Sequence, residues 1–329
     1  MFRRVLKTSM SRLKSARWAI LTLLLGPIVW VLYWIYKRHQ RITSIGYVPQ
    51  KDGRSHYISR SELETMFETR KKLGFGSFGI VWLVQQRTDR GDGALFALKE
   101  IDLGKPGLSH VTKEVETMMN LPPHRNIVKL HDHWVSDDVK DLWLLLDYCS
   151  EGTLVQFLNG TYQLPDDALL DVCTQLLQAL HVFEQHHIVH NDIKPENIFI
   201  MSDGKDRVPK IGDLGMARFT SVGSVLAKTP GCTPVFASPE VLSKQLGPDG
   251  QPSCFPEFSA CKISYQSDVY SLGVVMWALI MRRNPVRPGG ATPFAPNRVA
   301  NNKLRDLVND MLQPDPNLRP RASELVKRI

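Results

Sequence analysis

The chain has 329 residues, of which 43% are hydrophobic and 22% are charged. This composition is that of a globular protein and excludes a wholly disordered chain. No repeat of about 20–50 residues is present, which excludes a solenoid, and five cysteines are too few for a disulfide scaffold.

The positive charge is concentrated at the N-terminus. The whole chain carries +8, whereas residues 1–51 contain ten Lys/Arg and no Asp or Glu, and therefore carry +10. The remaining residues, 52–329, carry −2, the difference between these two values. The part of the chain that is long enough to fold is nearly neutral, so its charge does not predict a nucleic-acid partner.

An uncharged apolar segment follows a basic arm, residues 1–17. Residues 18–36 contain no charged side chain, and as a helix they would span about 28 Å, close to a hydrocarbon core of about 30 Å. Trp18 and Tyr36 stand at its two ends, as aromatic residues do at membrane interfaces. We therefore predict a single transmembrane helix over 18–36, which makes a membrane one partner, and a polar linker over 37–67.

Three glycines are spaced as in a phosphate-binding loop. Gly74, Gly76 and Gly79 follow the pattern G-x-G-x-x-G-x-V, which ends at Val81. Without Cβ atoms the backbone can approach phosphate oxygens closely. Apolar residues on both sides, including Leu73, predict two strands joined by a glycine turn. A dinucleotide-binding loop would instead lead from a strand into a helix.

A lysine ends the next apolar strand. Residues 94–99 are largely apolar and end at Lys99, whose amine can reach nucleotide phosphates as a point charge. Residues 112–121 are compatible with a helix. Glu114 in that helix is the candidate partner that would hold Lys99 extended.

Further polar residues gather in two short segments. Asp192, Lys194 and Asn197 lie within residues 190–197, and Asp213 lies within residues 211–215. Asp192 can orient a hydroxyl and accept its proton, and Lys194 can contact the transferred phosphate from the same side of an extended loop. Asn197 and Asp213 supply the hard oxygens that Mg²⁺ prefers. Each residue alone is more often a turn or surface residue, but the combination of H-x-D-x-K-x-x-N with a following D-x-G is highly specific.

Taken together, these motifs resemble the eukaryotic protein kinase superfamily over about residues 68–329. Segments around Thr233, Glu240, Asp268 and Arg319 add to the resemblance. It implies an α+β, bilobal fold, with a small β-rich lobe over 68–148 and a larger helical lobe over 149–329. It also implies that Arg319 pairs with Glu240, and that ATP and Mg²⁺ are the cofactors.

The same resemblance assigns the remaining nucleotide contacts. Leu146 is the gatekeeper, Asp147 to Cys149 form the hinge that holds adenine through backbone groups, and Ala97 belongs to the same site. Lys194 with Thr233 is the pattern of serine/threonine kinases. We therefore expect a protein substrate with a Ser/Thr acceptor, while no oligomeric state follows from these motifs.

Two departures keep other interpretations open. Asn191 stands where the family has an arginine that commonly receives an activation-loop phosphate, and Leu214 replaces the phenylalanine of D-F-G. One alternative is a membrane-tethered pseudokinase scaffold, although the lysine, the base and both metal ligands are present. Another is a Wee-type inhibitory kinase, because Asn191 and residues 193–200 resemble that subfamily, some of whose members are membrane-associated and phosphorylate tyrosine.

The charges that flank residues 18–36 leave the topology open. Six Lys/Arg precede the segment and four follow it, which mildly favours a cytosolic N-terminus. The use of ATP favours a cytosolic kinase domain instead, and we expect a single-pass membrane protein with that orientation. Residues 1–17 are Arg/Ser-rich and acid-free, so a mitochondrial membrane stays a second interpretation.

Overall fold

The computed structural model describes residues 57–76, 79–91, 93–104, 108–159, 164–204, 206–220, 223–227, 233–242, 261–283, 285 and 299–329. The basic arm, the predicted transmembrane helix over 18–36 and most of the predicted linker lie outside these residues. Within the described ranges, no helix combines the length and the apolar character that crossing a membrane requires.

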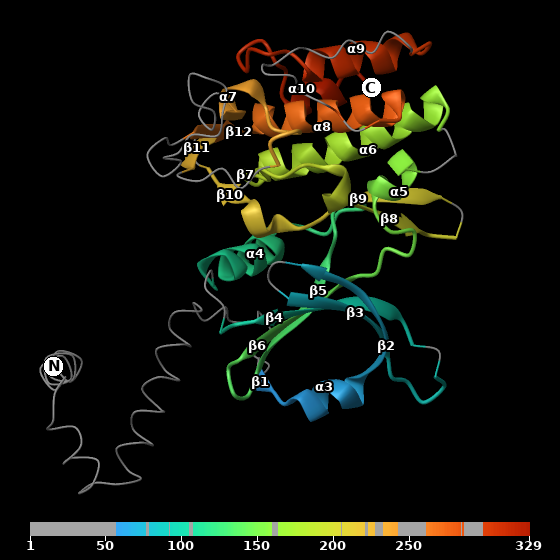
Figure 1. The fold of residues 1–329 in the computed structure, drawn as a ribbon, viewed down its shortest axis with the longest axis vertical. Coiled ribbons are helices and arrows are strands. Elements are labelled where there is room, and N and C mark those ends of the chain that lie inside the picture. The colour runs from blue at the N-terminus through green and yellow to red at the C-terminus, as the bar shows by residue number, and fades with distance from the viewer. Residues whose placement is uncertain are drawn as a thin grey trace, which may run out of the picture. The chain divides into compact units, whose positions relative to one another are not determined.

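A six-stranded sheet forms the N-terminal lobe (Figure 1). Its strand order is β1-β5-β6-β4-β3-β2, and every neighbouring pair is antiparallel except β1 with β5. The strands are β1 (Tyr57–Ile58), β2 (Phe67–Gly76), β3 (Gly79–Gln86), β4 (Leu95–Asp102), β5 (Leu130–Ser136) and β6 (Asp141–Asp147).

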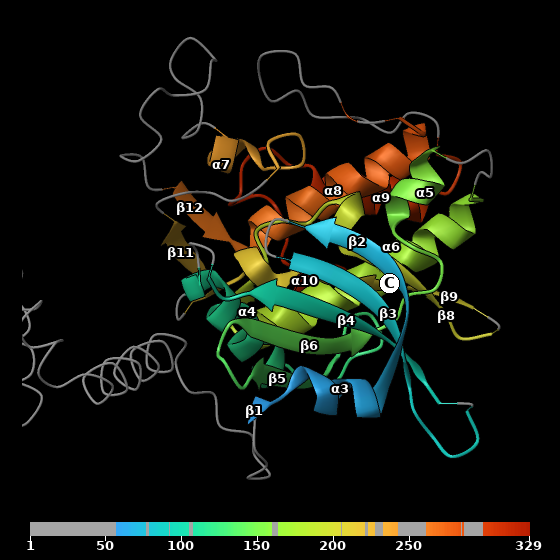
Figure 2. The same ribbon diagram turned by 60° about the horizontal axis from the view of Figure 1, so that its bottom comes forward.

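The last part of the predicted linker is ordered structure. Residues 57–66 form β1 and helix α3 (Arg60–Met66), rather than a polar spacer. Ser59 caps α3 in a reciprocal capping box with Glu62, which satisfies the first free N–H groups of the helix. Leu63 is buried against the sheet, because α3 lies on the side facing away from the helical lobe (Figures 1 and 2). This burial explains why the segment folds.

Helix α4 (Leu108–Asn120) lies on the other side of the sheet, toward the helical lobe (Figure 1). It contacts the short helix η2 (Leu214–Met216) of the larger lobe. Its buried residues include Glu114, Val115 and Met118. A buried glutamate in an otherwise apolar helix face needs a partner, and that partner lies on β4.

The C-terminal lobe is mainly helical. Its helices are α5 (Leu154–Asn159), α6 (Asp166–Gln185), α7 (Pro239–Leu242), α8 (Tyr265–Met281), α9 (Asn302–Met311) and α10 (Ala322–Val326). Three two-stranded pairs join them: β7 (Ile188–Val189) with β10 (Arg218–Phe219), β8 (Ile198–Ser202) with β9 (Arg207–Ile211), and β11 (Ser224–Ala227) with β12 (Cys261–Ser264). The predicted two-lobed α+β fold is confirmed.

Helix α8 is the centre of this lobe. Its side chains from Val274 to Leu279 are all buried, as expected for a helix that is apolar on every side. A Cβ atom on Gly273 would lie 2.9 Å from Cβ of Met311, so glycine permits the close approach of α9. This rigid helix carries Asp268, which organises the site described next.

Candidate active site

The glycine motif forms the predicted pair of strands. Gly74 faces Val81, and Gly76 faces Gly79, across the antiparallel β2–β3 pair. A Cβ atom on Gly79 would fall 1.7 Å from the backbone oxygen of Glu100, whereas one on Gly74 would meet nothing within 4 Å. Gly79 is therefore required by the packing of β3 on β4, and Gly74 borders open space.

An ion-paired lysine links the two lobes. Lys99 Nζ on β4 lies 2.7 Å from Oε1 of Glu114 on α4 and 3.8 Å from Oδ1 of Asp213. Burial disfavours the charged amine, but the carboxylates of Glu114 and Asp213 outweigh it and raise the pKa of Lys99. The predicted pairing of Lys99 with Glu114 is present. It holds the positively charged amine of Lys99 close to Asp213.

Sheet register gathers the other predicted nucleotide residues. Val81 faces Lys99 across β3–β4, and Ala97 faces Leu146 across β4–β6. Ala97 is buried, while Leu73 at the glycine motif is 39% exposed. The predicted nucleotide residues of the sheet therefore lie on β4, which carries Lys99, and on the strands near it.

Asp147, which the resemblance predicts to lie in the hinge, also has a structural role through its side chain. Its carboxylate accepts hydrogen bonds from Lys129 N (3.0 Å) and Lys210 Nζ (3.0 Å) and contacts His131 Nε2 (2.8 Å). Burial opposes the ionisation of Asp147, but these donors outweigh it and lower its pKa to about 2. The Asp147 side chain is therefore fixed as an anion at the junction between the sheet and β9.

Cys149, at the end of the predicted hinge, has an unreactive thiol. Burial, together with the negative charge of Asp147, raises the pKa of Cys149 to about 12. A thiol with such a pKa is not a nucleophile at neutral pH. Its predicted contribution through backbone groups needs no thiol chemistry.

Four polar side chains meet at the loop over residues 190–197, the candidate catalytic loop. Asp192 Oδ2 lies 2.7 Å from Lys194 Nζ and accepts a hydrogen bond from Asn197 Nδ2 at 2.9 Å. Asp192 Oδ1 accepts from the hydroxyl of Thr233 at 3.2 Å, and the same hydroxyl accepts from Lys194 Nζ at 3.0 Å. The hydroxyl of Thr233 therefore sits between a carboxylate and an amine.

A buried aspartate holds this loop by its backbone. Asp268 accepts hydrogen bonds from the N–H groups of His190 (2.6 Å) and Asn191 (2.8 Å). Burial raises the pKa of Asp268 to about 7, although the two backbone donors favour its charged form. Asn191 has φ of 69°, in the left-handed region that asparagine tolerates. Its backbone, rather than its side chain, makes the contact that orders the loop.

His190 joins the candidate catalytic loop to the segment that carries Asp213. Its Nδ1 accepts from the backbone N–H of Asp192 (3.3 Å), and its Nε2 contacts the carbonyl of Gly212 (3.1 Å). Burial lowers the pKa of His190, which keeps the ring neutral and suits Nε2 as the donor. His190 is thus a positioning residue that sequence spacing indicated only as the first letter of a motif.

Asn197 and Asp213 fit a magnesium ion by their chemistry. Asn197 uses its amide nitrogen on Asp192, which leaves its carbonyl oxygen as the ligand atom. The side chain of Asp213 is 46% exposed, and its backbone is left-handed, with φ of 60°. Within the described ranges no group of three or more His, Cys, Asp or Glu could hold a metal. Mg²⁺ commonly uses only one or two protein carboxylates together with substrate phosphates.

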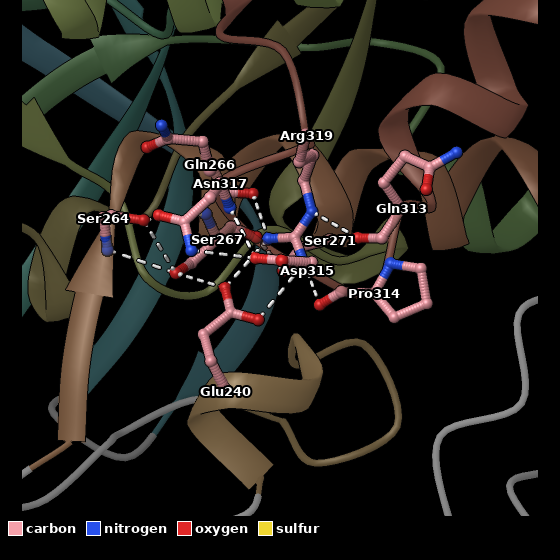
Figure 3. A network of polar contacts seen from close by, with 10 residues as sticks. All are labelled: Glu240, Ser264, Gln266, Ser267, Ser271, Gln313, Pro314, Asp315, Asn317 and Arg319. Atoms are coloured by element: carbon pink, nitrogen blue, oxygen red, sulfur yellow. Dashed lines mark hydrogen bonds and ion pairs between the residues drawn. The ribbon is translucent and has the colours of Figure 1, made fainter.

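The predicted Arg319–Glu240 pair is present at the base of α8 (Figure 3). Arg319 Nη1 and Nη2 donate to the two oxygens of Glu240 at 2.8 and 3.2 Å. The remaining donors of Arg319 bind the carbonyls of Gln266, Gln313 and Pro314. The guanidinium is fully satisfied and buried, so this pair fixes α7 and the segment after Thr233 on the helical lobe.

Lys210 is a charged residue near this site that sequence reasoning missed. It is buried on β9, where its amine binds Asp147 and the carbonyl of Ile127 (3.3 Å). A single lysine within an apolar strand was the available signal. Its partner lies on a different strand of the other lobe, and no local spacing points to it.

Comparisons with known proteins agree with this geometry. The family model described as "Protein kinase domain" matches residues 67–328. A probable serine/threonine-protein kinase nek3 of Dictyostelium discoideum is 27% identical over 79% of this chain and 23% of its own length. The membrane-associated tyrosine- and threonine-specific cdc2-inhibitory kinase wee-1.3 of Caenorhabditis elegans is 28% identical over 82% of this chain and 38% of its own length.

A third relative, the serine/threonine-protein kinase Nek11 of Macaca fascicularis, is 29% identical over 78% of this chain and 40% of its own length. The chain therefore spans less than half of each of these three relatives. The match to the family model nevertheless covers both lobes and every motif described above. The chain belongs to the protein kinase family.

Proposed function

We propose that this protein transfers the γ-phosphoryl group of ATP to serine or threonine hydroxyls of protein substrates. The observation that carries the proposal is the position of the Thr233 hydroxyl between Asp192 Oδ1 and Lys194 Nζ. An acceptor hydroxyl in an equivalent position can pass its proton to Asp192. The adjacent amine of Lys194 then neutralises charge on the transferred group.

Each remaining side chain has a role that follows from its contacts. Lys99 is held by Glu114 and binds nucleotide phosphates as a fixed positive charge. Asn197 keeps the Asp192 carboxylate oriented through its amide nitrogen. With Asp213 it would hold Mg²⁺, which supplies charge neutralisation on the phosphates when bound. Catalysis then depends mainly on positioning and on charge, which are the main requirements of phosphoryl transfer.

The proposal is tested by ATP-dependent labelling of a mixed Ser/Thr/Tyr peptide library, with wild type and Asp192→Asn compared. Asn cannot accept the proton, so labelling should fall by at least about 10²-fold. Label on serine or threonine in the wild type supports the proposal. Equal labelling by the variant would contradict the role of Asp192.

A Wee-type activity is the second candidate function. It is favoured by the similarity to the wee-1.3 kinase of C. elegans, whose description names tyrosine and threonine, and by Asn191 in the catalytic loop. Phosphoamino-acid analysis of the same labelled library separates the two. Phosphotyrosine beside phosphothreonine would favour this second candidate, and phosphoserine with phosphothreonine the first.

A pseudokinase scaffold stays an alternative with its own signature. The Lys99–Glu114 pair and the Asp192 cluster argue against it, because both sets of contacts are in place. Thermal unfolding with ATP and Mg²⁺ distinguishes the cases. A rise in melting temperature without any phosphotransfer would support the scaffold.

We also propose that residues 18–36 anchor the protein in a membrane, with the kinase domain on the cytosolic side. The support is the uncharged run between two basic flanks. Protease digestion of sealed vesicles that carry the full chain tests the orientation. Digestion of the kinase domain without detergent is expected, and its protection would contradict the proposed side.

A further inference from the structure

A second polar site lies on the outer face of the N-terminal sheet, under helix α3. Successive residues of β4 point to opposite faces, so Lys99 faces α4 while Glu100 faces α3. A cavity of about 230 Å³ is present there, between α3 and strands β2, β3, β4 and β6. Its apolar wall includes the buried side chains of Leu63, Phe67 and Leu98.

The carboxylate of Glu100 is fixed in this cavity by two tryptophans. The indole N–H of Trp82 donates to Oε2 at 3.0 Å, and that of Trp143 donates to Oε1 at 3.4 Å. Trp82 lies on β3 and Trp143 on β6, the two strands that flank β4. Two strands of the sheet therefore orient Glu100 through donors that do not belong to α3.

Arg60 forms an ion pair with the carboxylate of Glu100. Arg60, at the start of α3, donates from Nη2 to Oε1 of Glu100, and its guanidinium carbon lies 5.6 Å from the ring centroid of Trp143. Asp141 Oδ2 is 3.8 Å from the same Nη2. A carboxylate, an aromatic face and a second carboxylate together form a complete recognition site for a guanidinium group.

The exposed position of Arg60 would allow another arginine to replace it at Glu100. Its side chain is 56% exposed, whereas that of Glu100 is 16% exposed. It also belongs to a seven-residue helix that precedes the family match at residue 67. Among the charged residues of the described ranges that line the cavity, Glu64 and Glu100 are acidic and only Arg60 is basic, so the charge of the cavity favours another cation.

We propose that this cavity is a docking site for an arginine side chain of a partner protein, with Arg60 as the resident group that such an arginine displaces. The partner segment carries an apolar residue beside its arginine, because the wall next to Glu100 is apolar. Binding at this site is separate from phosphotransfer, since none of its residues contacts Asp192 or Asp213. While Arg60 is bound to Glu100, only a fraction of the protein molecules can bind the partner's arginine. The observed affinity for the partner is therefore weaker.

The test uses the full chain in detergent and the capped dipeptide N-acetyl-leucyl-argininamide. Binding is followed by the indole N–H resonances of Trp82 and Trp143, which report directly on Glu100. Arg60→Ala and Arg60→Gln should each bind the dipeptide at least tenfold more tightly than wild type, because the resident guanidinium is gone. Adding Glu100→Gln to either variant should abolish binding. Circular dichroism verifies the fold of each variant.

Two controls make the test specific. Arg70→Gln removes another partly exposed arginine of the same lobe, which pairs with Glu68 away from the cavity, and should leave the affinity at the wild-type value. The citrulline analogue of the dipeptide has the same shape without the charge and should not bind. Equal binding of citrulline and arginine, or no gain in either Arg60 variant, would overturn the proposal.

The wild-type chain provides a measurement that needs no variant. At high concentration the arginine dipeptide should shift both indole resonances, and the citrulline analogue should shift neither. Absence of any shift at saturating concentration would also overturn the proposal. A shift confined to tryptophans outside the cavity would do the same, because the dipeptide would then bind elsewhere.

Discussion

Charged side chains are satisfied differently at the lobe junction and at the base of α8. The Asp213 side chain is 46% exposed, and its nearest cation is Lys99 at 3.8 Å. The Arg319 side chain is 0% exposed and donates to Glu240 and to three backbone carbonyls. The exposed carboxylate of Asp213 can still bind a ligand, whereas the donors of Arg319 are all bound to other groups of the protein. The first region should therefore govern rate, and the second stability.

The largest expected effect is the loss of phosphotransfer in Asp213→Ala. The variant removes a proposed magnesium ligand without opening a core cavity, so the rate should fall on the order of 10³-fold while the melting temperature changes little. Radiometric ATP assays and thermal unfolding measure the two quantities. Asp203→Ala, which removes another partly exposed aspartate, is the matched control and should keep full activity. Undiminished turnover in Asp213→Ala would refute the mechanism.

Arg319→Ala should show the opposite behaviour, a large loss of stability. It leaves the Glu240 carboxylate and three carbonyls without their buried donor, which costs about 3–5 kcal/mol of unfolding free energy. Urea denaturation measures this loss. Arg319→Lys keeps the charge but not the forked geometry and should lose less. A cost below about 1 kcal/mol for Arg319→Ala would show that the pair does not stabilise the fold.

The contribution of the Asp147 carboxylate to stability should depend on pH. The pKa of Asp147 is lowered to about 2 from an ordinary value of 3.8, which corresponds to about 2 kcal/mol of stability. Because the folded pKa is depressed, this stability is present above pH 3.8 and is lost as the pH falls through about 2. Asp147→Asn should be less stable than wild type by that amount at pH 7.

The difference between wild type and Asp147→Asn should narrow as the pH falls from 4 toward 2, since the wild-type carboxylate then becomes protonated. Urea denaturation at pH 7, 4 and 3 follows this change. Asp206→Asn, an aspartate with an exposed side chain, is the control and should show little difference at any pH. A gap for Asp147→Asn that stays constant with pH would mean that its charge is not the stabilising feature.

Local spacing predicted those parts of the site that lie within one segment. Asp192, Lys194 and Asn197 are close in sequence and meet in space, as their pattern indicated. The Arg319–Glu240 contact followed only from the family resemblance, because the two residues are far apart in the chain. Sequence pattern therefore identified the chemistry well wherever a single loop supplies it.

Pairings between residues far apart in the chain were not predictable in this way. The Asp147–Lys210 pair joins β6 to β9, and the Arg60–Glu100 pair joins α3 to β4. Each partner alone is an ordinary charged residue, and only the complete fold places the two partners together. The pairing of β11 with β12 is a similar case, because the intervening residues are many and neither strand has a strong alternating pattern.

The smallest expected effect is that of Asn191→Arg, which should keep turnover within about tenfold of wild type. The loop is held at this position by the backbone N–H of Asn191, which donates to Asp268, and a side-chain substitution leaves that bond in place. The positive φ of 69° costs arginine somewhat more than asparagine. Asn191→Gly, which adopts positive φ freely, separates the two causes. If Asn191→Arg loses activity and Asn191→Gly keeps it, strain or size is responsible. If both lose activity, the amide of Asn191 belongs to the catalytic machinery, and the contrast between ligand-binding and structural groups would have to include it among the former.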